Sequence, residues 1–186
     1  ILTMTMVLFT AIAIVRERER DNMELLIATP LTRSELMVGK VLPYVAIGLV
    51  QTSVVLALGM WLFDVPIRGS VLDVYLASGL LILANLTLGL LISTRAQSQF
   101  QAMQMMIFVF LPSILLSGFM FPFAGMPKLV QWIAEVLPLT HFLRLIRGVM
   151  LRGASLWEMW VDVASLTVFT LAMMALAILR FRKRLD

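Results

Sequence analysis

The sequence predicts an all-α membrane protein, a polytopic bundle of transmembrane helices. Apolar residues make up 61% of the 186 residues, against roughly 45–50% in soluble domains. Charged residues make up only 14%, against roughly 25% in soluble domains. A soluble fold of this length has too little interior to bury so much apolar surface, so we expect lipid to solvate it. The same balance excludes a disordered chain, which would be polar and charged.

Four apolar segments are long enough to cross a bilayer, which takes about 20 residues of helix. We expect complete spans at residues 41–63, 74–92, 102–121 and 156–179. Residues 1–15 are apolar but too short to cross, so we expect the end of a membrane helix in a fragment of a longer protein. Four glycines within the spans are expected to let helices approach closely: Gly48, Gly59, Gly79 and Gly89.

The lysines and arginines are divided unevenly between the two sides of this bundle. Of the 15 basic residues, one side carries Arg16, Arg18, Arg20, Arg33, Lys40, Arg95, Arg180, Arg182, Lys183 and Arg184. Basic residues concentrate in cytoplasmic loops, so this side, including the tail at 180–186, is predicted to be cytoplasmic. Three tryptophans then fall at the opposite interface, as an aromatic belt would: Trp61, Trp157 and Trp160. The basic tail is better explained as a membrane anchor than as a nucleic-acid site, so no nucleic-acid partner is expected.

The predicted cytoplasmic segment at 16–40 contains two helix starts around one proline. We expect residues 22–29 to form a short helix that Asp21 can cap and that Pro30 ends. A capping box at 32–35 then opens the helix that leads into the first full span. The short helix is too apolar for open solvent, so we expect a protein partner or the membrane surface to cover it. An ordinary solvated loop is the alternative.

This segment resembles a known family of membrane proteins. Residues 16–19 (Arg-Glu-Arg-Glu), 23–36 and 39–40 (Gly-Lys) resemble the ABC-2 family of ABC transporter permeases. Further stretches are also similar to that family, namely 116–122, 126–127, 137–142, 147–148 and 179–183. The resemblance covers essentially the whole chain and is closest to the bacterial multidrug-type efflux branch. It implies that the family's first membrane helix, the start of its second and any large extracytoplasmic domain are missing.

The resemblance implies a coupling helix that docks on an ATP-binding subunit. The residues that it assigns to this contact are Arg16, Glu17, Arg18, Glu19, Met23, Glu24, Leu25, Leu26, Ile27, Thr29 and Pro30. It also implies two ATP-binding subunits and a second permease copy or a sister permease, in a bacterial inner membrane. The chain lacks a Gly-x-x-x-x-Gly-Lys-Ser/Thr loop, so ATP and Mg²⁺ would bind to the partner, and we expect no cofactor in this chain. A hydrophobic drug is the expected substrate, with ions, lipids or glycans as alternatives.

Segment 122–153 is predicted to form two short helices that Pro138 separates. They are too short to cross the bilayer, so a re-entrant or interfacial hairpin at the outer mouth fits them. Three residues there are candidates for an extracytoplasmic gate or an anion site: His141, Arg144 and Arg147. The alternative is that they reach lipid headgroups or pair with carboxylates. The candidate carboxylates are Glu135, Glu158 and Asp162, and we expect Asp162 to pair with Arg144 or Arg147.

Five polar residues within or near the spans could line a translocation path: Gln51, Asn85, Gln104, Ser113 and Ser117. Their alternative role is hydrogen bonding between helices. No catalytic or metal-binding residues are predicted, since the chain has no cysteine, a single histidine, and neither a His-Glu-x-x-His nor a Gly-x-Ser-x-Gly motif. An ATP-independent channel is the remaining alternative, although no ring of charged residues suggests one.

Overall fold

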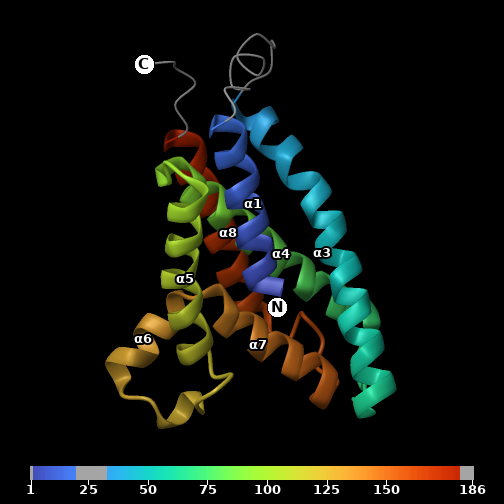
Figure 1. Cartoon of the computed structure of the whole chain (residues 1–186). Coiled ribbons are helices and arrows are strands. Elements are labelled where there is room, and N and C mark those ends of the chain that lie inside the picture. The colour runs from blue at the N-terminus through green and yellow to red at the C-terminus, as the bar shows by residue number, and fades with distance from the viewer. Residues whose placement is uncertain (1, 20–32, 181–186) are drawn as a thin grey trace.

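The computed structural model describes residues 2–19 and 33–180, and every regular element in these ranges is helical (Figure 1). The long helices are α1 (Leu2–Glu19), α3 (Arg33–Phe63), α4 (Val71–Arg95), α5 (Gln99–Leu116) and α8 (Trp160–Arg180). The short elements are η1 (Phe123–Gly125), α6 (Lys128–Val136), α7 (Pro138–Arg147) and the π-helical turn η2 (Gly148–Arg152). The predicted all-helical bundle is confirmed.

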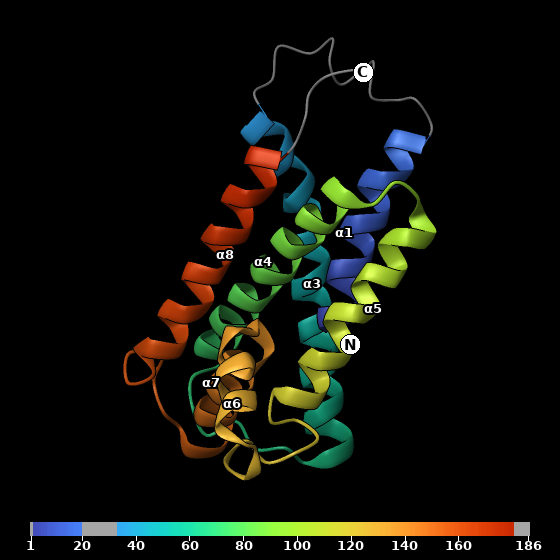
Figure 2. The same cartoon turned by 90° about the vertical axis from the view of Figure 1, so that its left-hand side faces the viewer.

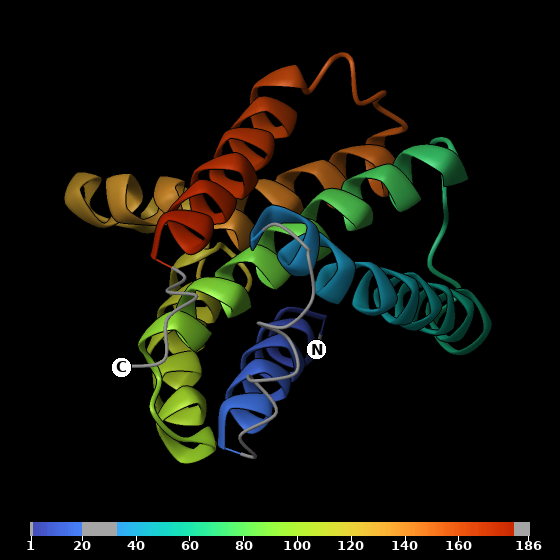
Figure 3. The same ribbon diagram turned by 90° about the horizontal axis from the view of Figure 1, so that it is seen from above.

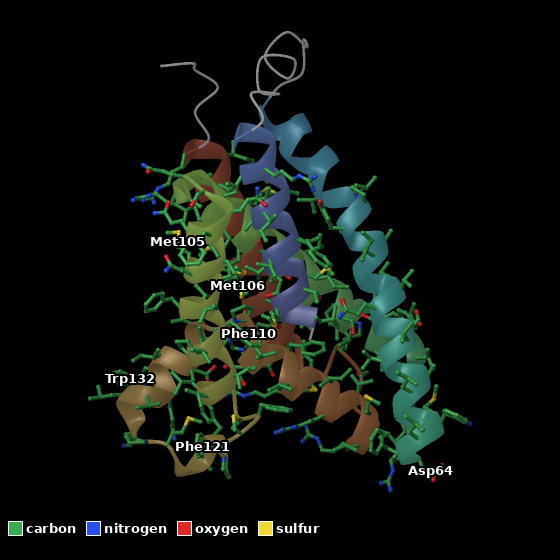
Figure 4. The ribbon with its side chains drawn as sticks, viewed as in Figure 1. Asp64, Met105, Met106, Phe110, Phe121 and Trp132 are labelled. Atoms are coloured by element: carbon green, nitrogen blue, oxygen red, sulfur yellow. The ribbon has the colours of Figure 1, made fainter. Side chains whose placement is uncertain are left out.

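The bundle has two distinct ends (Figures 1 and 2). At the end that we call the basic end, α1, α4 and α8 finish, with Arg16, Arg95 and Arg180 in their last turns. The other end, which we call the hairpin end, contains α6, α7, the end of α3 and the start of α8 (Figure 1). Figure 4 shows Trp132 of α6 pointing away from the bundle at this end. The four tryptophans, Trp61, Trp132, Trp157 and Trp160, are between 62% and 87% exposed, as side chains of an aromatic belt would be.

Four helices are long and apolar enough to span a membrane: Val41–Phe63, Val71–Arg95, Gln99–Leu116 and Trp160–Arg180. The third was expected to continue to residue 121, but α5 ends at Leu116 because Gly118, with φ 84°, takes a left-handed conformation that stops a helix. The segment before α8 also differs from expectation. Residues 156–159 form a turn, so α8 begins at Trp160 rather than at 156.

The late start of α8 moves two carboxylates relative to the helix. The Ser155 hydroxyl donates to the Glu158 carboxylate (3.3 Å) instead of accepting from a backbone N–H, so the capping box that would start a helix here does not form. Glu158 therefore precedes α8. Asp162, which was expected about two turns into the helix, lies in its first turn, where the helix dipole favours a negative charge.

Helix α4 forms the centre of the bundle. In its most apolar stretch of 18 residues, 67% of the stretch is buried inside the bundle, whereas the corresponding share in the other three spans is 11–17%. It contacts α1, α3, α5, α7 and α8. Its side chains take part in three clusters of buried apolar residues, one with α1, α3 and α8, one with α1 and α5, and one with α7 and α8.

Two of the four predicted glycine contacts are present. A Cβ on Gly48 would lie 2.8 Å from the Ile82 side chain, and a Cβ on Gly89 would lie 2.8 Å from the Val7 carbonyl oxygen. At Gly59 and Gly79, a Cβ would meet no heavy atom of the described residues within 4 Å, so the prediction is wrong for these two within this chain. A glycine brings helices together only where it lies on the crossing face, and composition does not reveal that face.

Gly89→Ala is therefore expected to destabilise the bundle, because the added methyl group would overlap the Val7 carbonyl and Thr10 Cβ across the α1–α4 contact. The expected loss is about 1–3 kcal/mol in the free energy of unfolding, as for other overpacked sites. The measurement is reversible unfolding of the purified protein in mixed micelles. Gly79→Ala in the same helix is the matched control and should be neutral or stabilising by up to about 1 kcal/mol. Equal stability of the two variants would contradict close packing at Gly89.

Candidate functional site

Helices α6 and α7 form a sharply bent pair at the hairpin end. Their axes meet at 88°, and Leu137 and Pro138 form the corner. Pro138 occupies the first turn of α7, where its missing N–H costs nothing, so it starts the second helix as well as ending the first. Figure 2 shows both helices across the end of the bundle, away from the basic end. The pair therefore places its polar side chains beside the start of α8.

His141 lies at the centre of a polar network in this corner. Its side chain is 8% exposed, and its Nδ1 lies 2.8 Å from Oδ1 of Asp162 on α8. Its Nε2 lies 2.8 Å from the backbone carbonyl oxygen of Glu135 on α6. Both neighbouring atoms are acceptors, so the imidazolium form satisfies both contacts while a neutral ring satisfies one. The ring thus connects α6, α7 and α8.

Arg144 completes the network from the next turn of α7. Its guanidinium binds both carboxylate oxygens of Glu135, with Nη1 3.0 Å from Oε2 and Nη2 bonded to Oε1. Nη1 also lies 3.6 Å from Oδ1 of Asp162, which confirms the expected ion pair and identifies Arg144 as the partner. The guanidinium lies over the Phe123 ring at 4.5 Å, a cation–π geometry. The Arg144 side chain therefore contacts residues of three other elements, namely α6, α8 and η1.

The ion pair changes the acidity of both partners. The hydrogen bond from Arg144 lowers the pKa of Glu135, although partial burial opposes the shift. The same hydrogen bond raises the pKa of Arg144, again against the effect of burial. The two side chains are 40% and 36% exposed, so solvent screens the pair and its net contribution to stability is small. Asp162 is 14% exposed, so we expect its loss to cost more than the loss of Glu135 or Arg144.

Arg147, the third candidate for a gate, is separate from this network. It is exposed and forms no ion pair with any residue in the described ranges. It borders a groove of about 390 Å³ between the end of α7, η2 and the start of α8. The other residues that line this groove are Arg144, Gly148, Leu151, Arg152, Met159 and Asp162. Of the three predicted gate residues, His141 and Arg144 thus belong to the polar network, and Arg144 and Arg147 border the groove.

The five residues predicted to line a path are spread over α3, α4 and α5 and have different surroundings among the described residues. Gln51 accepts a hydrogen bond from Thr5 (2.9 Å), which connects α3 to α1. Ser113 and Ser117 donate to carbonyl groups of the same segment, those of Val109 and Ile114. Gln104 is exposed on α5, and the fully buried Asn85 has no hydrogen-bond partner among the described residues. Neither the groove nor a second, apolar cavity of about 280 Å³ between α3, α4 and α7 includes any of the five.

Two polar features were missing from the sequence-based prediction. Tyr75 of α4 hydrogen-bonds to Ser53 of α3 at 2.6 Å, and a serine and a tyrosine that face each other across helices leave no local signal. Arg152 borders the groove because η2 is a π-helical turn, which residue spacing in an α-helix does not anticipate.

Most of the predicted coupling residues lie outside the described residues: Met23, Glu24, Leu25, Leu26, Ile27, Thr29 and Pro30. The others, at positions 16–19, belong to α1. Helix α1 thus runs through Glu19, four residues beyond the expected end of the membrane helix, because charged residues continue a helix readily where it leaves an apolar layer. Arg16 is exposed there.

Asp162→Asn is expected to destabilise the hairpin end, because it weakens the hydrogen bond to His141 and the ion pair to Arg144. The expected loss is about 2 kcal/mol, typical of a hydrogen bond to a charged group. The measurement is thermal unfolding of the solubilised protein. Glu158→Gln removes an exposed carboxylate four residues earlier and should change stability by less than about 0.5 kcal/mol. Equal behaviour of the two variants would show that the network does not hold α7 against α8.

Acid should loosen the Glu135–Arg144 pair. The pKa of Glu135 is lower in the folded protein than in the unfolded chain, so its stabilising contribution is complete above the ordinary pKa and disappears as the pH falls through the lowered one. We therefore expect the unfolding temperature to drop between about pH 5 and pH 3, and to drop less steeply in Glu135→Gln. Identical pH profiles of parent and variant would contradict the role of this pair.

The comparisons with known proteins agree with this architecture. Residues 1–151 match the family described as ABC-2 type transporter. The "Probable multidrug ABC transporter permease YbhS" of Escherichia coli (strain K12) is 34% identical over 187 residues, which cover 100% of this chain and 50% of that protein. The "Inner membrane transport permease YhhJ" of the same strain is 34% identical over 183 residues, 98% of this chain and 49% of that protein.

A eukaryotic relative extends the comparison. "ABC transporter G family member 20" of Dictyostelium discoideum is 29% identical over 174 residues, 91% of this chain and 24% of that protein. The chain spans about half the length of the bacterial relatives that it matches. With a family match over residues 1–151, full coverage by a relative at 34% identity and four apolar helices long enough to span a membrane, the chain belongs to the ABC-2 type transporter family of multi-pass membrane permeases.

Proposed function

We propose that this chain is part of the membrane-spanning permease of an ATP-driven exporter in the bacterial inner membrane, and that the exported substrate is a hydrophobic, drug-like molecule. The observation that carries the proposal is similarity along the whole chain to two proteins named as probable multidrug ABC transporter permeases. A bundle whose spans expose large apolar side chains to their surroundings is consistent with a substrate that enters from lipid.

ATP hydrolysis in this proposal belongs to a separate subunit. The sequence has no phosphate-binding loop of the Gly-x-x-x-x-Gly-Lys-Ser/Thr type, so the partner binds ATP and Mg²⁺. Residues 20–32, between α1 and α3, would form the contact, because both helices have their adjoining ends at the basic end (Figure 1). The excess of lysine and arginine on this side supports a cytoplasmic location of the basic end and the C-terminus in this proposal. Both helices pack on α4, so a force on their connection reaches the centre of the bundle.

The hairpin end is the outer mouth of the pathway in this arrangement. His141 and Arg144 would hold the hairpin against α8, and a change in this contact would open or close the exit, in the manner of alternating access. Helix α5 exposes Phe100 and Phe108 by 66% and 80%. A second permease copy or a sister permease, together with lipid, would cover such side chains.

The coupling role can be tested on the full-length permease, produced together with its ATP-binding subunit. The test variant replaces the charge and the apolar side chains at Glu24, Leu25, Leu26 and Ile27 with serine. We expect loss of the co-purified subunit and of substrate-stimulated ATP hydrolysis, because the contact surface is removed. The matched control replaces Leu129 and Ile133, exposed apolar residues of α6 at the opposite end, with serine. This control should keep the complex.

The two ways in which this experiment can fail have different meanings. If the complex forms equally well with the test variant, the coupling contact lies elsewhere on the permease. If the parent protein retains no ATP-binding subunit and conducts ions without ATP, the exporter proposal is wrong and the channel alternative replaces it.

A further inference from the structure

The backbone forms a π-helical turn, η2, between α7 and the connection to α8. In η2, the Gly148 carbonyl accepts hydrogen bonds from the N–H of Gly153 and, at 3.1 Å, from that of Ala154. Gly153 ends the turn with φ 71°, a conformation that other residues rarely adopt. A π-turn closes on i→i+5 hydrogen bonds and therefore brings residues five positions apart toward one side. Here those residues are Arg147 and Arg152, and both border the groove.

The bare backbone of Gly148 holds one of these arginines inside the groove. A Cβ at this position would overlap the Met159 sulfur and would lie 3.3 Å from Nη2 of Arg152. The Arg152 guanidinium therefore folds back over Gly148, beside Met159 from the turn before α8. Arg152 is exposed, so its guanidinium remains accessible to a ligand while it lies against Gly148.

The groove carries unbalanced positive charge. The carboxylate of Asp162 is already bound by His141 and Arg144, and Arg144 also pairs with Glu135. Arg147 and Arg152 have no carboxylate partner within the described ranges. Two guanidinium groups in one groove repel each other, and an anion between them removes that cost. Arginine matches phosphate in particular, because its planar N–H groups can donate two parallel hydrogen bonds to one phosphate.

The surroundings of the groove place it at the level of lipid headgroups. It lies at the hairpin end, and Met159, which lines it, stands in the chain between Trp157 and Trp160. These two tryptophans are 87% and 62% exposed, and tryptophan side chains concentrate at the membrane–water interface. Figure 3 shows the connection between η2 and α8 at the periphery of the bundle. Leu151, half exposed, and Met159 add an apolar wall. The site thus combines two free arginines with an apolar contact at an interface.

We propose that Arg147 and Arg152 bind the phosphate group of an anionic phospholipid in the leaflet at the hairpin end, with Leu151 and Met159 against its glycerol and upper acyl chain. This inference concerns the lipid environment of the permease and does not depend on the transported substrate or on ATP coupling. The alternative is that both arginines only compensate the negative, C-terminal end of α7 and η2.

The test titrates phosphatidylglycerol onto the full-length permease with its ATP-binding subunit in detergent, and native mass spectrometry counts the bound lipid. In the double variant Arg147→Gln/Arg152→Gln, the affinity for phosphatidylglycerol should fall about tenfold or more, since two charge-assisted contacts are lost. The affinity for phosphatidylcholine should not change. The matched control is Lys128→Gln, which removes an exposed basic residue at the same end but outside the groove, and should leave both affinities unchanged.

Two further variants keep the result interpretable. Arg147→Lys/Arg152→Lys keeps the charge but loses the paired donors, so it should bind phosphatidylglycerol with intermediate affinity. Gly148→Ala keeps both arginines but displaces Arg152 and Met159, and it should also weaken binding. If the double glutamine variant loses thermal stability but binds the lipid like the parent, the arginines only compensate the helix end. If inorganic phosphate binds to the parent protein but phosphatidylglycerol does not, the groove binds soluble phosphate, and the lipid assignment is wrong.

Discussion

The packing of every long helix on α4 determines where the rest of the chain lies. Helices in lipid gain little from burying apolar surface, because acyl chains are as apolar as leucine side chains, so their association depends on close van der Waals contact. Small residues provide this contact, as at Gly48 against Ile82 and Gly89 against the Val7 carbonyl. Ala77 and Ala84 do the same toward α7 and α8. Because α4 contacts α1, α3, α7 and α8 while its neighbours remain open to their surroundings, it is the main connection from α1 and α3 to α8 and the hairpin, beside a small direct contact between α3 and α8 and a second route through α5.

The hairpin end is held by a different kind of interaction. Helices α6 and α7 have nine and ten residues, and beside the apolar cluster around Leu145 and Leu166 a polar network of His141, Arg144, Glu135 and Asp162 attaches them to α8. Hydrogen bonds and ion pairs are directional, so small movements of α6 or α7 weaken them. The interaction energy of the apolar contacts around α4 depends less on orientation. The molecule therefore has a firmly packed centre and an end whose attachment responds to charge and protonation.

The sequence predicted the parts of this structure that depend on long-range averages. Twenty-residue apolar runs predicted the spans, and the cost of an unpaired charge near the membrane predicted that Asp162 would pair with Arg144 or Arg147. Features decided by a single local bond were not predictable. Ser155 bonds to a carboxylate instead of a backbone N–H, and α8 starts four residues late. No described atom lies within 4 Å of a Cβ at Gly59 or Gly79, and a π-helical turn brings Arg152 to the groove that Arg147 also lines. The coupling segment could be inferred only from resemblance, since the residues that decide it lie outside the described ranges.

Asn85 has a consequence for the energy of the bundle as a whole. Its amide is fully enclosed in α4, and neither its oxygen nor its nitrogen has a partner among residues 2–19 and 33–180. A buried polar group without a hydrogen-bond partner costs about 1–3 kcal/mol, so Asn85 is the side chain of α4 at which a polar neighbour would stabilise the bundle most. Because α4 is the most enclosed of the four spans, such a neighbour has to come from within the membrane-embedded part of the assembly rather than from its surface.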